Sequence, residues 1–232
     1  NWPSQVYDIE RSTIDFARMR ALFFASRDFT LAGTGEFTGR FALARDFREL
    51  TGRFRSPRTR LTMFDFDDVR GSLAWTRDRF EVTESHMAFA GGRLDLHYQY
   101  APLGAPTPAH QRLDTRYAGV DVEQVSRIIG LDGMRVAGRA DGRHVLDFPG
   151  SHFDQRTGEG EMVVTAPEAQ RMQGRELIAL ASGPPPPPPP LDRDAPLGRV
   201  PIVAELRYAY DGPRIDVSRS YVATEETYVE FS

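Results

Sequence analysis

A long alternation of apolar and polar positions runs from Phe29 to Leu43. The odd positions hold apolar residues or glycine, and most even positions hold small or polar residues. A period of two over this length predicts one long β-strand with an apolar face and a polar face. Three glycines, Gly33, Gly35 and Gly39, lie on the apolar face, although glycine weakens a strand unless another backbone or a ligand comes close. The stretch therefore predicts a sheet that curls around something.

Shorter alternating segments follow, together with two stretches of helical periodicity. Apolar spacing predicts amphipathic helices over residues 14–25, with Ser12 or Thr13 as N-cap, and over residues 121–130. Residues 1–10 carry no pattern and predict an irregular lead-in. Further strands are predicted near residues 50–57, 61–66, 69–75, 80–82, 87–89, 94–100, 134–148, 158–164, 202–208, 215–217 and 229–231. A short helix is expected over 168–180, and seven prolines at 184–190 predict an extended polyproline segment.

Blocks of similar sequence recur in the same order in the two halves of the chain. Residues 15–23 resemble 121–129, residues 31–40 resemble 136–143, and residues 73–85 resemble 206–220. The repeat predicts a lead-in over 1–11, a first copy over 12–110 and a second over 111–232, with a proline-rich insertion loop over 183–198. Repeated units of this kind predict an elongated array in which each copy contacts mainly its neighbours. Chance similarity between amphipathic β segments is the alternative explanation.

Composition narrows the classes of function. The chain has 232 residues, a net charge of −4 and no cysteine. The mild charge gives no reason to expect nucleic acid as a partner, and the lack of cysteine removes disulfides, thiolate catalysis and cysteine metal sites. The sequence begins at Asn1 without methionine and ends in strand-like sequence, so we expect it to be a piece of a longer protein.

No set of residues predicts an enzyme, a cofactor or a metal site. Asp65 and Asp67 would share one strand face and do not suit a carboxylate pair that straddles a glycosidic bond. A second set offers metal-ligand side chains: His144, Asp147, His152 and Asp154. Its spacing matches no metal-ligand pattern. A local basic cluster comprises Arg53, Arg55, Arg58 and Arg60. It suggests either a solvated loop or contacts with lipid headgroups.

Three motifs carry a resemblance to a known family. After the first predicted helix come GTGEFTGRFAL (33–43), VRGSLAW (69–75) and FAGGRLDL (89–96). Over residues 12–100 and 117–232 the chain resembles the AsmA-like family, which includes the TamB-type translocation and assembly proteins of Gram-negative envelopes. The proline-rich insertion departs from the family pattern.

The resemblance implies a fold and a function. The expected fold is mainly β: an elongated, strongly curved antiparallel sheet, a β-groove built of repeats with short amphipathic helices. The expected function is a non-enzymatic segment of a cell-envelope lipid-transfer protein, whose apolar groove shields phospholipid acyl chains between the inner and outer membranes and supports outer-membrane biogenesis. The expected location is the periplasm, in a parent protein anchored in the inner membrane. The expected partners are phospholipid or another acyl-chain lipid, outer-membrane assembly proteins, and the membrane itself through regions outside this sequence.

A lipid groove also has a physical basis in the pattern of the chain. Each acyl CH₂ that leaves water gains about 0.8 kcal/mol, and an apolar sheet face supplies the surface. The residues expected to line the groove are Phe29, Leu31, Phe37, Phe41, Leu43, Leu73, Trp75, Leu94, Leu96, Val136, Leu206 and Tyr208. Two other functions fit the same pattern: a carbohydrate- or protein-binding β-sandwich that uses Trp75 and the tyrosines as a platform, and a structural β-solenoid spacer.

Overall fold

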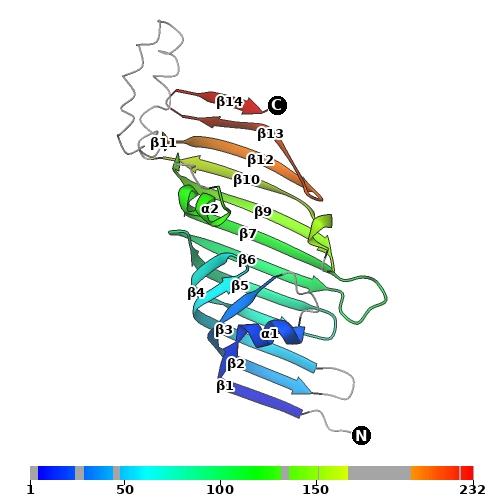
Figure 1. Ribbon diagram of the computed structural model, residues 1–232. Coiled ribbons are helices and arrows are strands. Elements are labelled where there is room, and N and C mark those ends of the chain that lie inside the picture. Colours follow the sequence, from blue (N-terminus) through cyan, green and yellow to red (C-terminus); the bar gives the residue numbers. More distant parts are fainter. Residues whose placement is uncertain are drawn as a thin grey trace, which may run out of the picture.

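A computed structural model describes residues 5–23, 29–43, 48–131, 136–150, 152–166, 200–224 and 226–231. These residues form one antiparallel sheet of 12 strands, in the order β1-β2-β3-β4-β5-β6-β7-β9-β10-β12-β13-β14, and a parallel pair, β8 (Val136–Ala137) with β11 (Val200–Pro201). The strands of the large sheet stack along one long axis in chain order (Figure 1). The sheet is open, because β1 and β14 each pair with one neighbour among the described strands. The prediction of a mainly β, antiparallel fold is confirmed.

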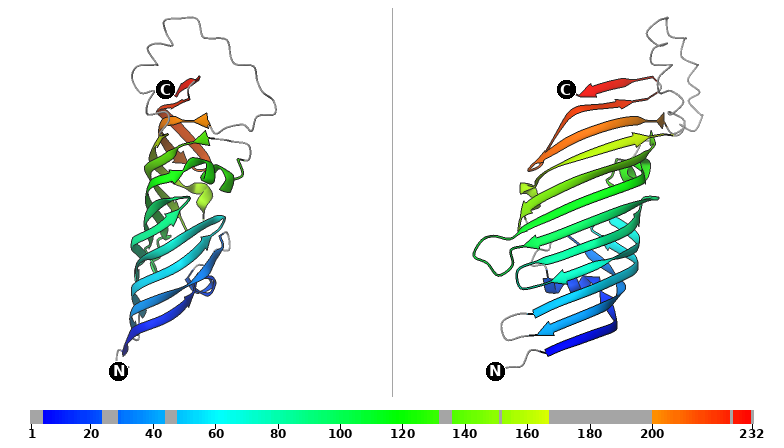
Figure 2. Two further views of the ribbon diagram at one scale, coloured as in Figure 1. Left: turned by 90° about the vertical axis from the view of Figure 1, so that its left-hand side faces the viewer. Right: turned by 180° about the vertical axis from the view of Figure 1, so that it is seen from behind.

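The large sheet has six strands before the loop at 102–109 and six after it. The first six are β1 (Gln5–Asp15), β2 (Leu31–Leu43), β3 (Arg48–Leu61), β4 (Phe64–Trp75), β5 (Phe80–Phe89) and β6 (Gly92–Ala101). The last six are β7 (His110–Asp121), β9 (Arg139–Pro149), β10 (Thr157–Thr165), β12 (Val203–Asp211), β13 (Arg214–Ala223) and β14 (Tyr228–Phe231). Three short helical elements lie on the same face of the sheet: α1 (Phe16–Phe23), α2 (Val122–Ile128) and the 3-10 turn η1 (Phe153–Gln155). Figure 2 shows the sheet edge-on and from behind.

The twofold period of the sequence gives the sheet two faces of opposite character. On the face that carries the helices, hereafter the apolar face, strand pairing aligns apolar residues and glycine in rows. One row comprises Ile9, Gly39, Gly52, Leu73, Val82, Tyr98, Leu113, Leu146, Gly158, Tyr210 and Ile215. On the other side, the polar face, a parallel row comprises Thr13, Glu36, Arg55, Arg70, His86, Asp95, Arg116, Arg143, Glu161, Arg207 and Ser218.

Two small clusters of buried residues anchor the helices to the apolar face. Phe37, Leu73 and Phe80 form the first, and Met19 of α1 packs against it. Ala140, Val164 and Ala204 form the second, and Val122 of α2 packs against it. Each helix therefore covers only part of the face, one in each half of the sheet (Figure 1).

Both helices begin at an aspartate that ends the preceding strand. The Oδ1 atoms of Asp15 and Asp121 accept hydrogen bonds from the backbone N–H groups of Arg18 and Gln124, each at 3.1 Å. A side-chain acceptor at this position satisfies one of the free N–H groups of the first helical turn. The predicted caps Ser12 and Thr13 are wrong, because residues 5–15 continue β1 up to the helix.

Strand β1 also corrects the predicted lead-in over residues 1–11. Residues 5–11 belong to β1 and pair with β2, although most of their side chains are exposed. Charged residues are tolerated there because an edge strand pairs with only one neighbouring strand and its other side faces solvent.

The first predicted strand after β2 ends too early. β3 continues through Pro57, which lies at a bulge where Ser56 and Pro57 oppose the single residue Gly35 of β2. A bulge leaves a backbone N–H outside the ladder, so proline fits there. The predicted strand over 61–66 is instead a hairpin that turns at residues 62–63. The predicted helix at 168–180, the insertion loop at 183–198 and the polyproline segment at 184–190 lie outside the described residues.

Candidate functional site

The apolar face is the main surface feature of the molecule. Its central row continues from Ile9 at one edge of the sheet to Ile215 on the strand next to the other edge, without a charged residue. Between the two helix-covered clusters it is formed by Leu94, Leu96 and Leu113, which are half-buried and belong to neither cluster. The central row is therefore free of charge from β1 to β13, and the face is accessible in part.

Aromatic rings of the chain itself lie against the glycines of this face. A Cβ placed on Gly52 would meet the ring of Phe37 at 2.6 Å, and one placed on Gly160 would meet the ring of Tyr208 at 2.4 Å. Gly142 lies in the same way beneath the ring of Tyr117. In sheets, an aromatic side chain on one strand commonly covers a glycine on the adjacent strand, as these rings do.

The three glycines predicted to admit another backbone or a ligand are Gly33, Gly35 and Gly39. A Cβ placed on any of them would first meet a backbone carbonyl oxygen of β3, at 2.2–2.6 Å, so the close approach of another backbone is confirmed. Gly39 also lies beneath the ring of Phe37, which such a Cβ would meet at 2.8 Å.

The structure gathers ten of the twelve residues predicted to line a groove on this one face. They are Leu31, Phe37, Phe41, Leu43, Leu73, Trp75, Leu94, Leu96, Leu206 and Tyr208. Phe29 precedes β2 and lies beneath the guanidinium of Arg20, 5.9 Å from the ring centroid. Val136 belongs to the two-stranded pair and not to the large sheet.

A group of aromatic polar residues surrounds Tyr208, which was predicted to line the groove, on the same face. Tyr117, Tyr208 and Tyr210 are half-buried, and burial raises the pKa of each hydroxyl. The rings of Tyr208 and Tyr210 meet edge to face, with centroids 5.5 Å apart. His144 lies beside Tyr117 at 6.2 Å between ring centroids, and burial lowers its pKa, which favours the neutral imidazole. The second half of the apolar face is therefore the more polar half.

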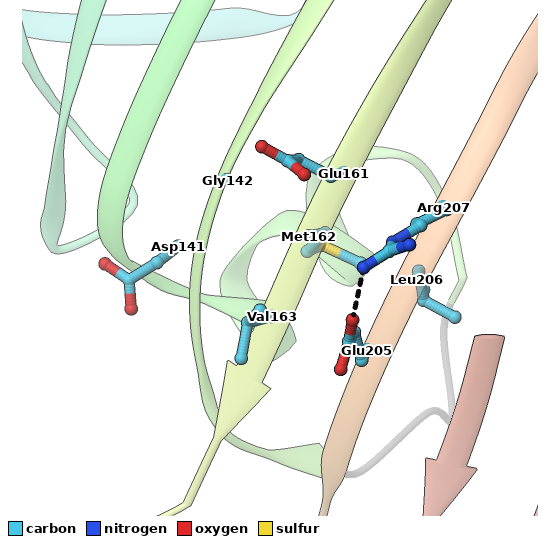
Figure 3. Close-up of a pocket in the computed structure, with 8 residues that line it drawn as sticks. All are labelled: Asp141, Gly142, Glu161, Met162, Val163, Glu205, Leu206 and Arg207. Carbon is cyan, nitrogen blue, oxygen red and sulfur yellow. Dashed lines mark hydrogen bonds and ion pairs between the residues drawn. The ribbon is translucent and has the colours of Figure 1, made fainter. Parts of the chain in front are cut away.

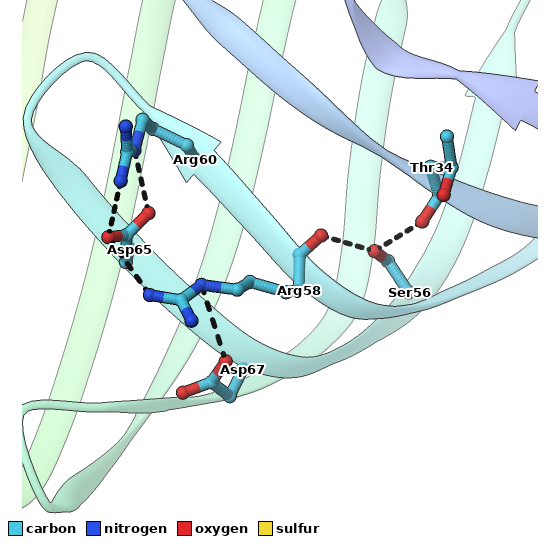
Figure 4. A network of polar contacts seen from close by, with 6 residues as sticks. All are labelled: Thr34, Ser56, Arg58, Arg60, Asp65 and Asp67. Atoms are coloured by element: carbon cyan, nitrogen blue, oxygen red, sulfur yellow. Dashed lines mark hydrogen bonds and ion pairs between the residues drawn. The ribbon is translucent and has the colours of Figure 1, made fainter.

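The polar face is held by ion pairs between neighbouring strands. Figure 4 shows Asp65 between two arginines: Arg60 Nε donates to it at 2.8 Å, and Arg58 Nη2 donates to it at 3.2 Å. These bonds lower the pKa of Asp65 to about 2, so its carboxyl stays ionised. Asp67 lies 3.9 Å from Arg58. A general acid needs a raised pKa, so this pair of carboxylates is arranged for cross-strand attraction and not for proton transfer.

The candidate metal ligands do not converge. His144 is on the apolar face, whereas Asp147 is on the polar face and lies 2.8 Å from Nδ1 of His110. Among the described residues, no three His, Cys, Asp or Glu side chains are grouped so that they could hold a metal ion. None of the helices in the described ranges has the length and apolar character needed to cross a membrane.

One small hollow lies over β9, β10 and β12, with a volume of about 210 Å³ (Figure 3). Its lining residues are Asp141, Gly142, Glu161, Met162, Val163, Glu205, Leu206 and Arg207. Glu205 and Arg207 pair with each other at 3.1 Å. The other two carboxylates, of Asp141 and Glu161, have no base or nucleophile beside them within this lining. The hollow therefore offers no catalytic arrangement.

The apolar face and the tyrosines thus carry the functional argument for this chain. The likeness to the AsmA-like family rests on the sequence motifs and stays a prediction. Among family models, curated proteins and solved structures, none matches this chain.

Proposed function

We propose that the apolar face binds the acyl chains of phospholipid, and that the chain is a non-enzymatic segment of a cell-envelope lipid-transfer protein. The observation that carries this proposal is the uncharged row that crosses the sheet from Ile9 to Ile215. Twelve strands about 4.8 Å apart extend this face over roughly 50 Å. A surface of that length suits a long apolar ligand.

The energetic argument follows from transfer of hydrocarbon out of water. Each acyl CH₂ buried against the face gains about 0.8 kcal/mol, so ten of them contribute about 8 kcal/mol before the ordering of the chain is subtracted. No residue has to recognise the acyl chain by hydrogen bonding. The half-buried Leu94, Leu96 and Leu113, between the two helix-covered clusters, are the accessible part of this surface.

Corresponding elements in the two halves support an elongated groove built of two repeats. Each half has a strand, an aspartate-capped helix and five further strands in the large sheet. In the fifth sheet strand of each half, a buried serine, Ser85 or Ser220, follows a residue with a φ of 48°, Glu84 or Arg219. The sequence blocks that resemble one another therefore fall on corresponding strands, as duplication of one unit would require.

Bulges support curvature toward the helices. The strand pairs β4–β5, β5–β6 and β12–β13 each shift register beside a residue with positive φ: Asp68, Glu84 and Arg219. A bulge bends its strand and strengthens the local twist. Bends repeated from strand to strand would fold the sheet along its length, with α1 and α2 inside the fold.

The remaining elements of the proposal come from the family resemblance. They are a periplasmic location, a parent protein anchored in the inner membrane, transfer of phospholipid toward the outer membrane, and contact with assembly proteins there. A two-sheet β-sandwich is disfavoured, because the described residues place all their long strands in one sheet. A spacer with a filled core is disfavoured by the half-buried leucines of the central face.

Native mass spectrometry with lipid extraction tests the proposal. The purified chain is expected to carry phospholipid, and Leu96→Asp with Leu113→Asp is expected to remove it while circular dichroism shows the fold retained. The control is Gln99→Asp, which adds one negative charge to the polar face of the strand that holds Leu96 and is compared with Leu96→Asp alone. A wild-type chain that stays lipid-free after incubation with phospholipid vesicles would refute the proposal.

A further inference from the structure

Three tyrosine hydroxyls form a line on the second half of the apolar face. Tyr117 projects from β7, and Tyr208 and Tyr210 project from β12, on the same side of the sheet. The hydroxyl of Tyr208 interacts electrostatically with those of the other two. All three rings are half-buried, so part of each remains accessible. We call this set the tyrosine line.

The tyrosine line ends at Arg156, which pairs with no carboxylate among the described residues. The guanidinium carbon of Arg156 lies 4.6 Å from the ring centroid of Phe153 and 5.7 Å from that of Tyr210. Its Nη1 donates to the carbonyl oxygen of Phe153 at 3.2 Å. None of the ion pairs found between described residues includes Arg156. Within the described ranges, the other N–H donors of its guanidinium are therefore available to an anion.

The first half of the apolar face has a different character. Its buried cluster consists of Phe37, Leu73 and Phe80, and the hydroxyl of Tyr98 is already used in a 2.8 Å hydrogen bond to Gln111. A ligand with one anionic end and one hydrocarbon end would therefore find its two environments at different places along the same face. Binding sites commonly combine an apolar lining with a few polar groups that fix orientation.

We propose that Arg156 and the tyrosine line bind the phosphate-bearing headgroup of an anionic phospholipid, whose acyl chains then lie along the apolar face toward β6. This inference rests on the function proposed above and assigns the orientation of the ligand. Arginine presents several N–H donors in a plane that matches phosphate oxygens, and the adjacent rings hold the guanidinium by cation–π contact. The tyrosine hydroxyls add donors along the path of the headgroup.

The test compares two lipids that differ only in the headgroup. The chain is mixed with phosphatidylglycerol and with diacylglycerol of the same acyl chains, and both complexes are quantified by native mass spectrometry. We expect the wild type to prefer phosphatidylglycerol about tenfold, because a hydrogen bond to a charged group is worth at least that factor. Arg156→Gln should lose this preference and keep diacylglycerol binding, whereas Arg156→Lys, which keeps the charge and loses the planar donors, should keep only part of it.

Controls separate this inference from the function on which it rests. Arg53→Gln removes an exposed arginine from the polar face and should leave the preference unchanged, and circular dichroism checks the fold of each variant. If Arg156→Gln keeps the preference, the headgroup site is overturned while acyl-chain binding stands. If the wild type binds neither lipid, the proposed function fails as well. If inorganic phosphate alone binds at Arg156 and phosphatidylglycerol is not preferred, the cation serves a free anion and the lipid orientation is overturned.

Discussion

Replacing Gly160 by alanine tests the contact between glycine and aromatic ring most sharply. The new Cβ would lie 2.4 Å from Cε2 and Cζ of Tyr208 and 2.6 Å from its hydroxyl oxygen. Ordinary contact begins at 3.4 Å, so the ring has to move by about 1.0 Å, which is 3.4 Å less 2.4 Å. Overpacking of this kind costs about 1–3 kcal/mol, whereas an unhindered glycine-to-alanine change stabilises by about 0.4–1 kcal/mol. The expected result is a net loss of stability.

A double-mutant cycle isolates the cause. The three atoms nearest to the new Cβ all belong to Tyr208, so Gly160→Ala should turn from destabilising to stabilising in a Tyr208→Ala background. The assay is urea unfolding followed by far-ultraviolet circular dichroism, and each 1 kcal/mol should also move Tm by about 2–4 °C. Gly52→Ala is the contrasting control. It meets backbone atoms of Thr38 and Gly39 as well as Phe37, so shortening Phe37 should not rescue it. A stabilising effect of Gly160→Ala in the wild type would refute the reasoning.

Three further changes have defined outcomes. Ser220→Ala should lower the free energy of unfolding by about 1–3 kcal/mol, because the buried hydroxyl of Ser220 accepts a hydrogen bond from the N–H of Arg207 at 2.7 Å. Urea titration measures this loss, and Ser218→Ala, at an exposed position, should have no effect in the same titration. Burial lowers the pKa of His144 below 6.5, so the folded state should lose stability as the pH falls below about 6.5. His144→Phe should make the stability less dependent on pH, and an unchanged pH profile in this variant would contradict the burial argument. The pKa of Asp65 lies at about 2 against an ordinary 3.8, so the contribution of its carboxylate to the free energy of unfolding should be complete above about pH 4 and disappear toward pH 2. Wild type and Asp65→Asn should therefore become equally stable toward pH 2.

The alternation of apolar and polar residues predicted most of the strands, because all side chains on one face of a strand meet the same surroundings, either core or solvent. It predicted β2 almost to the residue. It failed for β1, whose position at the edge permits charged and exposed side chains on both faces. It failed again at Pro57, because a bulge removes the need for the missing backbone donor.

For the candidate site, the sequence could predict which residues share one face of the sheet but not which of them become neighbours. Ten of the predicted lining residues share the apolar face because alternation determines the side on which a residue lies. Alternation does not determine which strands become neighbours, so it did not bring Tyr117 together with Tyr208, 91 positions later in the sequence. The pairing of β7 with β9, β9 with β10 and β10 with β12 brings them together. Arg156 was missed because it lies in the turn that follows η1, where no periodic pattern applies.

The order of strands in the large sheet also determines how the molecule comes apart. In the described residues, each strand hydrogen-bonds only to the strands that precede and follow it in that sheet, and no pairing joins β1 to β14. Losing an edge strand breaks one ladder and leaves the next strand as the new edge, so opening can proceed from either end toward the middle. Native-state hydrogen exchange would then be fastest in β1 and β14 and slowest near β6 and β7. The loop at 102–109, where the two halves meet, would lie within the part of the molecule that opens last.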